Sequence, residues 1–494
     1  MNSFKRLASD TAIYGASSIV GRFLNWWLVP YYSFMFLPAE YGVVTNMYAY
    51  VAFFLVLLTY GMETSYFRYA SKNPDPEKVY STSIISLFFT TLSFVLLASV
   101  FRHEIAALIQ YPDHPEYVLW FAVILGIDAF TAIPFARLRL NNRPIKFAFI
   151  KFVFIGFNIG FNIFFISLCP KLLENNPDSI IRLVYSQEIG VGYVFISNLL
   201  ASIITLILLL PEILRISFSF DKKLLKQMLS YGFPILIVGL TGMVNQNIDK
   251  VLIPFLIPEN QDPMFQLGIY GANYKLAVLM NMFIQAFRYA FEPFFFARGG
   301  TKDDPKVYAT VMKYFVIFGL LIFLGMVLYI DLVKIIIDPK YHVGLKVVPL
   351  ILMANLFFGI YFTLSLWYKL TDKTRYGAYM ALIGAVITLV LNIVLIPKIG
   401  YMGSAIAVFT CFFVMMVISY VLGQKFYPVP YDLKRIVIYF AVVLVLYFLT
   451  FYTEGLNSIL KYALHTIFMG VFLFNIFSFE KSDLKKLFSR NKKA

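Results

Sequence analysis

The sequence of 494 residues contains few residues of the kinds that build metal centres, disulfides and nucleotide sites. Its two cysteines, Cys169 and Cys411, lie far apart without a CxxC pattern, so they predict neither a metal site nor a disulfide framework. None of the four histidines occurs at metal-ligand spacing. The motif GxxxxGK[ST] is also absent, which argues against an ATP-driven pump formed by this chain alone.

Charged residues are scarce as well, at 14%, whereas 60% of the residues are hydrophobic. A helix that crosses a bilayer needs about 20 mainly apolar residues. Stretches of this length fill nearly the whole chain, and the gaps between them are too short for a catalytic domain. We therefore expect an all-α integral membrane protein with fourteen transmembrane helices, at residues 11–34, 41–66, 81–101, 117–136, 147–168, 189–210, 229–257, 267–296, 311–333, 347–368, 377–397, 401–423, 436–453 and 459–479.

The net charge of +15 could indicate a nucleic-acid partner, but its distribution argues otherwise. Lys and Arg number 29 in the two terminal segments and every second gap, against 8 in the intervening gaps, when Lys313 and Lys461 at span ends are counted with the adjacent gaps. This asymmetry follows the positive-inside rule and predicts that both termini lie in the cytoplasm. We expect the basic segment 481–494 to be a cytoplasmic tail that faces lipid headgroups, and no nucleic-acid partner.

Two parts of the chain are similar to each other. Tyr-Gly pairs at Tyr14 and Tyr231 begin the first and seventh predicted spans, and residues 140–162 align without a gap with residues 370–392. The pattern predicts two six-helix lobes in the same orientation around a central cavity, with the site at their interface. The alternative is that all membrane helices share such a composition. The predicted parts are an N-terminal lobe at 1–215, a C-terminal lobe at 216–424, two further helices in 425–480 and the tail at 481–494.

Apart from Lys313, Asp331 and Lys461, which lie at the third position from a span end, nine charged residues fall inside the predicted spans. A charge at a helix centre costs roughly 2.5–3.5 kcal/mol on insertion scales. Such residues normally face a wet cavity or a partner, so we expect a hydrated interior. Helical spacing places several of them on one face with neighbouring amides. The candidate cavity residues are the cations Arg22, Lys151, Lys275 and Arg288, the amides Asn25, Asn158, Asn245, Asn281 and Gln285, and the acids Glu63, Asp128, Asp249 and Glu292, which could couple transport to an ion.

Each candidate cation could have a structural role instead of a role in the cavity. A neighbouring backbone carbonyl could hold Arg22, and Lys151 lies close enough to a helix end to reach the membrane surface. Lys275 is near the predicted outer surface and off the face that carries Arg288. Arg288 and Glu292 are four residues apart and could form a structural ion pair.

Other intramembrane polar residues have more specific structural interpretations. Asn158 and Asn162 lie on one face of the fifth span, and we expect them to hydrogen-bond across helices rather than to bind a ligand. Asp249 shares a helix face with Asn245. We expect the adjacent Lys250 to point elsewhere, because it lies off this face and near the outer end of its span.

Several short motifs occur in the order and spacing of a known family. They are Tyr14-Gly15 through Arg22 and Pro30, Leu37-Pro38-Ala39-Glu40-Tyr41-Gly42, Tyr231-Gly232-Phe233-Pro234 with Asp249-Lys250, Gly268-Ile269-Tyr270-Gly271 with Lys275, and residues 391–400 followed by Gly403 and Ala405. In these motifs the chain resembles the O-antigen and exopolysaccharide flippases. This group is the polysaccharide-transport branch of the multidrug/oligosaccharidyl-lipid/polysaccharide (MOP) flippase superfamily.

The resemblance implies a cavity that opens alternately to either face of a bacterial inner membrane. The implied cargo is a polyprenyl-diphosphate-linked oligosaccharide, moved from the cytoplasmic to the outer leaflet for O-antigen, capsule or exopolysaccharide synthesis. A diphosphate is anionic, so Arg22, Lys151 and Arg288 would favour it, and arginine can bind phosphate bidentately. By analogy with peptidoglycan-precursor flippases, the helices at 436–453 and 459–479 could form a groove for the polyprenyl tail.

Three alternatives belong to other functional classes or substrates. A lipid-linked peptidoglycan-precursor flippase would share the fold. A cation-coupled multidrug exporter is disfavoured because Arg22 occupies the helix in which such exporters would place a carboxylate. A membrane enzyme such as a polymerase or ligase would need a large outer loop, which the sequence lacks. We expect a transporter without a cofactor, with H⁺ or Na⁺ as a candidate coupling ion, and with membrane lipids, glycan polymerases and glycosyltransferases as partners.

Overall fold

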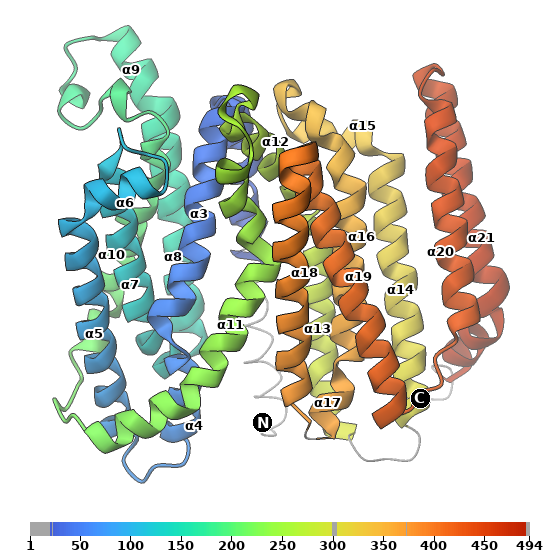
Figure 1. Ribbon diagram of the computed structural model, residues 1–494, viewed down its shortest axis with the longest axis horizontal. Coiled ribbons are helices and arrows are strands. Elements are labelled where there is room, and N and C mark those ends of the chain that lie inside the picture. Colours follow the sequence, from blue (N-terminus) through green and yellow to red (C-terminus); the bar gives the residue numbers. More distant parts are fainter. Residues whose placement is uncertain (1–19, 22, 299–303, 372, 491–494) are drawn as a thin grey trace. The chain divides into compact units, whose positions relative to one another are not determined.

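The computed structural model describes residues 20–21, 23–298, 304–371 and 373–490. These residues are mostly helical and include no strand (Figure 1). The contacts divide them into two compact units. Unit 1 runs to Ala272 and includes Thr388–Tyr401, and unit 2 consists of Asn273–Ile387 and the residues from Met402 onward.

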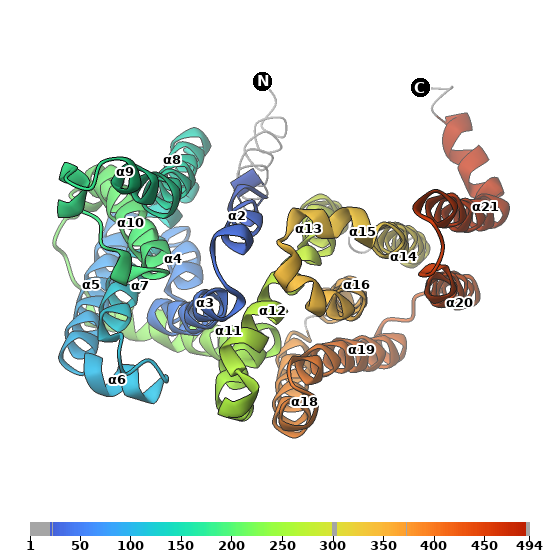
Figure 2. The same ribbon diagram turned by 90° about the horizontal axis from the view of Figure 1, so that it is seen from above.

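Unit 1 is organised around α7, which packs against α3, α5, α8 and α10 (Figure 2). A π-helical turn at Phe164–Leu168 follows α8. The C-terminal part of α18 also belongs to this unit. The helices of unit 1 are α2 (Leu28–Met35), α3 (Pro38–Thr59), α4 (Met62–Ala70), α5 (Pro76–Val100), α6 (Arg102–Leu108), α7 (Pro115–Leu140), α8 (Pro144–Ile163), α9 (Cys169–Asn175), α10 (Gly192–Ile213), α11 (Lys222–Leu256) and α12 (Pro263–Leu276), whose last turn passes into unit 2.

Unit 2 is organised around α14, which packs against α13, α16, α20 and α21. Two short 3₁₀ segments, Lys334–Ile336 and Pro339–Val347, lead into α16. The helices of unit 2 are α13 (Val278–Arg298), α14 (Asp304–Leu328), α15 (Ile330–Val333), α16 (Val348–Leu364), α17 (Leu366–Leu370), the first part of α18 (Arg375–Ile399), α19 (Tyr401–Phe426), α20 (Leu433–Thr450) and α21 (Ser458–Arg490).

The start of α3 shows how the sequence sets helix ends. Pro38 occupies the first helical turn, where its fixed φ fits and its missing N–H is not needed. The backbone N–H of Leu37 donates to Glu40 Oε2 at 2.7 Å, so the glutamate satisfies a donor at the helix start. The motif Leu37-Pro38-Ala39-Glu40 is therefore a helix-capping motif in this structure.

Twelve helical segments among the described residues are long and apolar enough to cross a membrane. Residues 11–19 and 22 of the predicted span 11–34 lie outside the described residues, and α2 covers the end of this span. The predicted span 267–296 is divided between α12 and α13, and α13 contains Arg288, Glu292 and Arg298 in its 21 residues. A multi-pass membrane protein is thus confirmed, whereas the number fourteen stays a prediction.

Candidate functional site

Asp128 on α7 belongs to a polar network inside unit 1. Ser202 Oγ on α10 donates to Asp128 Oδ1 at 3.1 Å. One turn earlier on α10, Asn198 Nδ2 donates to the hydroxyl of Tyr48 on α3 at 2.8 Å. Asp128 also interacts electrostatically with Lys151 on α8. The network therefore joins four membrane helices around a carboxylate.

Lys151 has an aromatic partner rather than an ion-pair partner. Its Nζ lies 4.0 Å from the ring centroid of Phe135 on α7, in a cation–π contact. Among the described residues, no carboxylate lies within ion-pair distance of this lysine, and its interaction with Asp128 acts over a longer range. A half-buried ammonium in this state retains its capacity to bind an anion.

Arg288 on α13, in unit 2, also has an aromatic partner. Its guanidinium carbon lies 3.8 Å from the ring centroid of Phe362 on α16. Asn281 and Gln285 precede it on the same helix, and all three side chains are half-buried. No described carboxylate forms an ion pair with Arg288, while the side chain of Glu292 lies outside the described part. The half-buried guanidinium has N–H donors that can bind phosphate oxygens.

Asp249 and Lys250 on α11 form a buried ion pair. Lys250 Nζ lies 2.9 Å from Asp249 Oδ1, and the hydroxyl of Tyr270 on α12 donates to Asp249 Oδ2 at 2.6 Å. Asn46 Nδ2 on α3 donates to the carbonyl oxygen of Lys250 at 2.8 Å, and Tyr111 donates to Asn46 Oδ1 at 3.0 Å. The prediction that Lys250 points elsewhere is wrong, because its flexible stem carries the ammonium back to the adjacent carboxylate.

Two further carboxylates in the membrane helices are also paired with cations. Glu63 on α4 accepts from Arg139 on α7. Glu480 on α21 is fully buried and accepts from Lys313 on α14, from Arg435 at 3.2 Å and from the Tyr439 hydroxyl at 2.8 Å. The Glu480 cluster was not predicted from the sequence, although Lys313 lies just inside the start of one predicted span and Glu480 just beyond the end of another.

The remaining predicted site residues differ in their burial and hydrogen bonding. Asn158 is buried on α8, where its carbonyl oxygen accepts from Asn162 Nδ2 at 2.8 Å. Asn162 Oδ1 also accepts from Tyr32 on α2 at 2.9 Å, which is a cross-helix bond of the predicted kind. Asn245 is buried on α11, and Asn25 and Lys275 are exposed. Arg22 lies outside the described residues.

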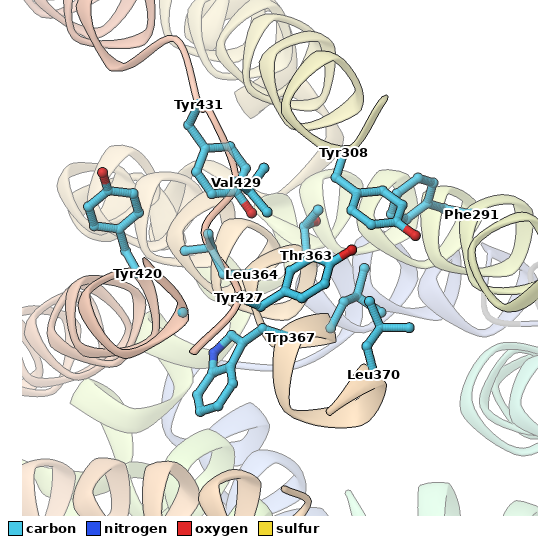
Figure 3. A pocket seen from close by; sticks show the side chains of 12 residues that line it. Phe291, Tyr308, Thr363, Leu364, Trp367, Leu370, Tyr420, Tyr427, Val429 and Tyr431 are labelled. Carbon is cyan, nitrogen blue, oxygen red and sulfur yellow. The ribbon is translucent and has the colours of Figure 1, made fainter. Parts of the chain in front are cut away.

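An aromatic pocket in unit 2 is too small to hold a sugar. Figure 3 shows Tyr308, Trp367, Tyr427 and Tyr431 among the side chains that surround it. Its cavity volume is about 20 Å³, which is room for about one water molecule. The ring of Trp367 stacks on Phe426 with 5.4 Å between centroids. This pocket is therefore a tightly packed junction of α13, α14, α16, α17 and α19.

The fold is shared with known membrane transporters. The chain matches the inward closed conformation of the lipid II flippase MurJ with a TM-score of 0.68 and 15% identity, over 95% of this chain and 99% of that chain. It matches an inward-facing multidrug resistance MATE transporter with a TM-score of 0.65 and 11% identity, over 86% of this chain and 98% of that chain. A MATE transporter of Vibrio cholerae, VcmN, gives a TM-score of 0.52 at 12% identity, over 86% and 98%. No curated protein sequence matches the chain.

These likenesses show that the chain shares the fold of solved membrane transporters. Residues 7–297 match the family described as "Polysaccharide biosynthesis protein". The match covers more than half of the chain, and the protein belongs to this family. The resemblance stated from sequence motifs is thereby confirmed at the level of the superfamily and of its polysaccharide branch.

Proposed function

We propose that the protein moves a polyprenyl-diphosphate-linked oligosaccharide from the cytoplasmic to the outer leaflet of a bacterial inner membrane by alternating access. The family membership supports a role in polysaccharide biosynthesis. The observation that carries the proposal is that Lys151 and Arg288 contact aromatic rings and form no ion pair with a described carboxylate. Cations in apolar helices are costly unless they serve a ligand or a partner.

The chemistry of the two cations fits a diphosphate. An arginine presents a planar set of donors that can bind two phosphate oxygens at once, and a lysine supplies a compact positive charge. Other cations of the membrane helices are already paired with carboxylates, among them Lys250 with Asp249, Lys313 with Glu480 and Arg139 with Glu63. Lys151 and Arg288 are therefore the described intramembrane cations that we assign to the phosphate groups. Arg22 and Lys275 complete the proposed set from the sequence.

Asp128 is the carboxylate that we propose for coupling to H⁺ or Na⁺. Glu63 and Asp249 each form an ion pair, which reduces their freedom to bind another cation. Asp128 instead accepts from the neutral Ser202 hydroxyl, and its interaction with Lys151 links its charge to the proposed phosphate site. Protonation of Asp128 would remove a negative charge near Lys151 and so favour an anionic cargo there.

The test uses the purified protein in proteoliposomes with a fluorescent nitrobenzoxadiazole label on the sugar of a polyprenyl-diphosphate substrate. Dithionite outside the vesicle bleaches the label only in the outer leaflet, so the rate of further bleaching reports flipping. We expect flipping with the native protein and a loss of about 10-fold or more for Lys151→Ala and Arg288→Ala, since a charge-assisted contact contributes roughly 1.5–3 kcal/mol. The exposed Lys171 on α9 provides the matched control Lys171→Ala.

The lipid-linked peptidoglycan precursor is the second candidate cargo. The similarity to the MurJ flippase spans 95% of this chain but shows the fold alone. The same vesicle assay with that precursor distinguishes the two cargoes. Faster flipping of the peptidoglycan precursor than of a polyprenyl-diphosphate oligosaccharide would overturn the first assignment. Export of cationic drugs without glycan flipping would overturn both.

A further inference from the structure

An apolar cavity of about 550 Å³ lies inside unit 1, apart from Lys151 and its network. Its walls come from α3, α5, α6, α7 and α11. The volume falls in the range of roughly 300–1,000 Å³ that is typical of small-molecule sites. The side chains around it are almost entirely apolar, such as Met47, Phe94, Phe121 and Val251. A site with this lining selects a hydrocarbon chain rather than a sugar or an ion.

The rim of the cavity faces the hydrocarbon of the bilayer. Leu97 and Phe101 are 59% and 50% exposed, and Leu108 is 74% exposed. Leu97 belongs to α5, Leu108 belongs to α6, and Phe101 joins the two helices. Helix α5 is long and apolar enough to cross the membrane. Exposed apolar side chains on such a helix are in contact with lipid. The cavity is therefore accessible to a lipid chain from the side of the protein.

The short helix α6 brings opposite charges to the same rim. Phe101 and Ile105 line the cavity, and Arg102 and Glu104, which lie between them in the sequence, are both exposed. The structure shows no ion pair between these two charged side chains, and Arg102 Nε donates to His103 Nε2 at 3.3 Å. Because α5 ends at Val100, α6 lies at the end of a membrane span, where lipid headgroups are found.

We propose that this cavity binds one acyl chain of a zwitterionic phospholipid whose headgroup carries a phosphate and a primary ammonium, as in phosphatidylethanolamine. Arg102 donates to the phosphate, and Glu104 accepts from the ammonium. An anionic phospholipid would satisfy Arg102 but would be repelled by Glu104. The polyprenyl diphosphate carrier would bring more negative charge against the same glutamate. The charge pattern therefore selects a bilayer phospholipid over the transported substrate.

The site has a well-packed floor that explains why the cavity persists. Ala98, Ala106, Val118 and Ala122 form a buried cluster that joins α5, α6 and α7. Small side chains let these helices approach closely at the floor, while larger residues stand around the opening. Replacing Ala122 with Phe adds a ring to the wall of the cavity, since Ala122 lines it. This substitution removes the space for a chain and leaves the headgroup charges in place.

The test uses tryptophan as a local probe in the full-length protein. Phe101→Trp places an indole at the rim, and Phe474→Trp places one on the lipid-exposed surface of α21, where Phe474 is 73% exposed. Both variants are reconstituted with phosphatidylethanolamine or phosphatidylglycerol that carries brominated acyl chains, which quench tryptophan on contact. The native protein, with its four tryptophans, supplies the background to subtract.

We expect brominated phosphatidylethanolamine to quench Trp at position 101 at least twofold more than brominated phosphatidylglycerol does at the same mole fraction. At position 474 the two lipids should quench equally. Adding Glu104→Gln should remove the preference at position 101, and adding Ala122→Phe should reduce quenching by both lipids there. A melting temperature within about 2 °C of the parent variant controls for folding.

Three results would overturn the proposal. Equal quenching by the two lipids at position 101 would show that no headgroup is selected. A preference for phosphatidylglycerol would reverse the assigned chemistry. Relief of quenching at position 101 by unbrominated polyprenyl diphosphate at low mole fraction would show that the cavity binds the carrier lipid instead. All three readings are independent of whether the protein flips a glycan.

Discussion

Gly42 on α3 and Gly268 on α12 bring the backbones of two helices into contact inside unit 1. A Cβ atom on Gly42 would lie 3.2 Å from the Gly268 nitrogen, and a Cβ on Gly268 would lie 3.0 Å from the Gly42 nitrogen and overlap the Pro38 carbonyl oxygen. No side chain can give way at this crossing, since the opposing atoms are backbone. Two of the motifs that carry the family resemblance thus meet as a helix contact.

Replacing Gly268 with Ala is therefore expected to destabilise the protein. Overpacking in a dense interior typically costs about 1–3 kcal/mol, and here the helices must separate. The melting temperature in detergent should fall by several degrees. Gly242→Ala on α11 is the matched control, because nothing lies within 4 Å of the added methyl group and Ala favours a helix over Gly by about 1 kcal/mol. An unchanged melting temperature for Gly268→Ala would contradict the close packing.

The Glu480 cluster should be a second determinant of stability. Glu480→Gln leaves Lys313 buried without its carboxylate, and breaking a buried pair from one side typically costs about 3–5 kcal/mol. The double variant Lys313→Met, Glu480→Gln removes that uncompensated charge. We expect the single variant to melt at a lower temperature than the double variant. The opposite order would show that the charge on Lys313 is satisfied without Glu480.

Removing the charge of Asp128 should change the ion dependence of flipping, whereas removing the charge of Asp249 should change the stability. Asp128→Asn is expected to abolish the dependence of flipping on pH or on Na⁺, because it removes the proposed coupling group. Asp249→Asn should retain that dependence and should reduce the melting temperature, because Lys250 then lies buried beside a neutral amide. The vesicle assay under an imposed H⁺ or Na⁺ gradient makes the comparison. Retained ion dependence in Asp128→Asn would remove this residue from the proposed coupling role.

Asp221, at the start of α11, makes a pH-dependent contribution to the stability of the folded protein. Its Oδ1 accepts from the backbone of Lys223 and Leu224, and its Oδ2 lies 2.8 Å from Lys78 Nζ. The hydrogen bond from Lys78 is the largest cause that lowers the pKa of Asp221 from 3.8 to about 2. Because the pKa is lower in the folded state, this contribution is present above pH 3.8 and is lost as the pH falls through about 2.

The variant Asp221→Asn keeps the oxygen that caps α11 and removes the charge. Native protein should melt at a higher temperature than this variant above about pH 5, and the difference should shrink between about pH 4 and pH 2. A difference that stays constant over this interval would show that the charge of Asp221 does not contribute. The measurement is a melting temperature series in a detergent that tolerates acid.

The sequence predicted the membrane helices well because hydrocarbon thickness fixes the length of an apolar span. It predicted the positions of polar side chains less well. Helical spacing gives the direction of a Cβ atom but not the end of a long side chain, which is why Lys250 could not be assigned to Asp249. The partner of Glu63 is Arg139, 76 residues away, and no local pattern indicates such a pairing.

The predicted internal repeat agrees with the structure in one local hydrogen bond. The alignment of residues 140–162 with 370–392 superimposes Asn162 and Asn392. In the structure Asn162 Nδ2 donates to the Asn158 carbonyl oxygen at 2.8 Å, and Asn392 Nδ2 donates to the Thr388 carbonyl oxygen at 2.7 Å. Both asparagines are fully buried. The aligned residues therefore make the same hydrogen bond one turn back along their helices.

The proposed phosphate-binding role of Lys151 and Arg288 is tested most directly by the flipping rate of a labelled polyprenyl-diphosphate oligosaccharide in proteoliposomes. We expect Lys151→Ala and Arg288→Ala to lose about 10-fold or more of the rate, and Lys151→Arg to retain more activity than Lys151→Ala because it keeps the charge. Lys171→Ala should flip at the native rate. Native flipping rates in both alanine variants, in vesicles where the protein is folded, would contradict the assignment.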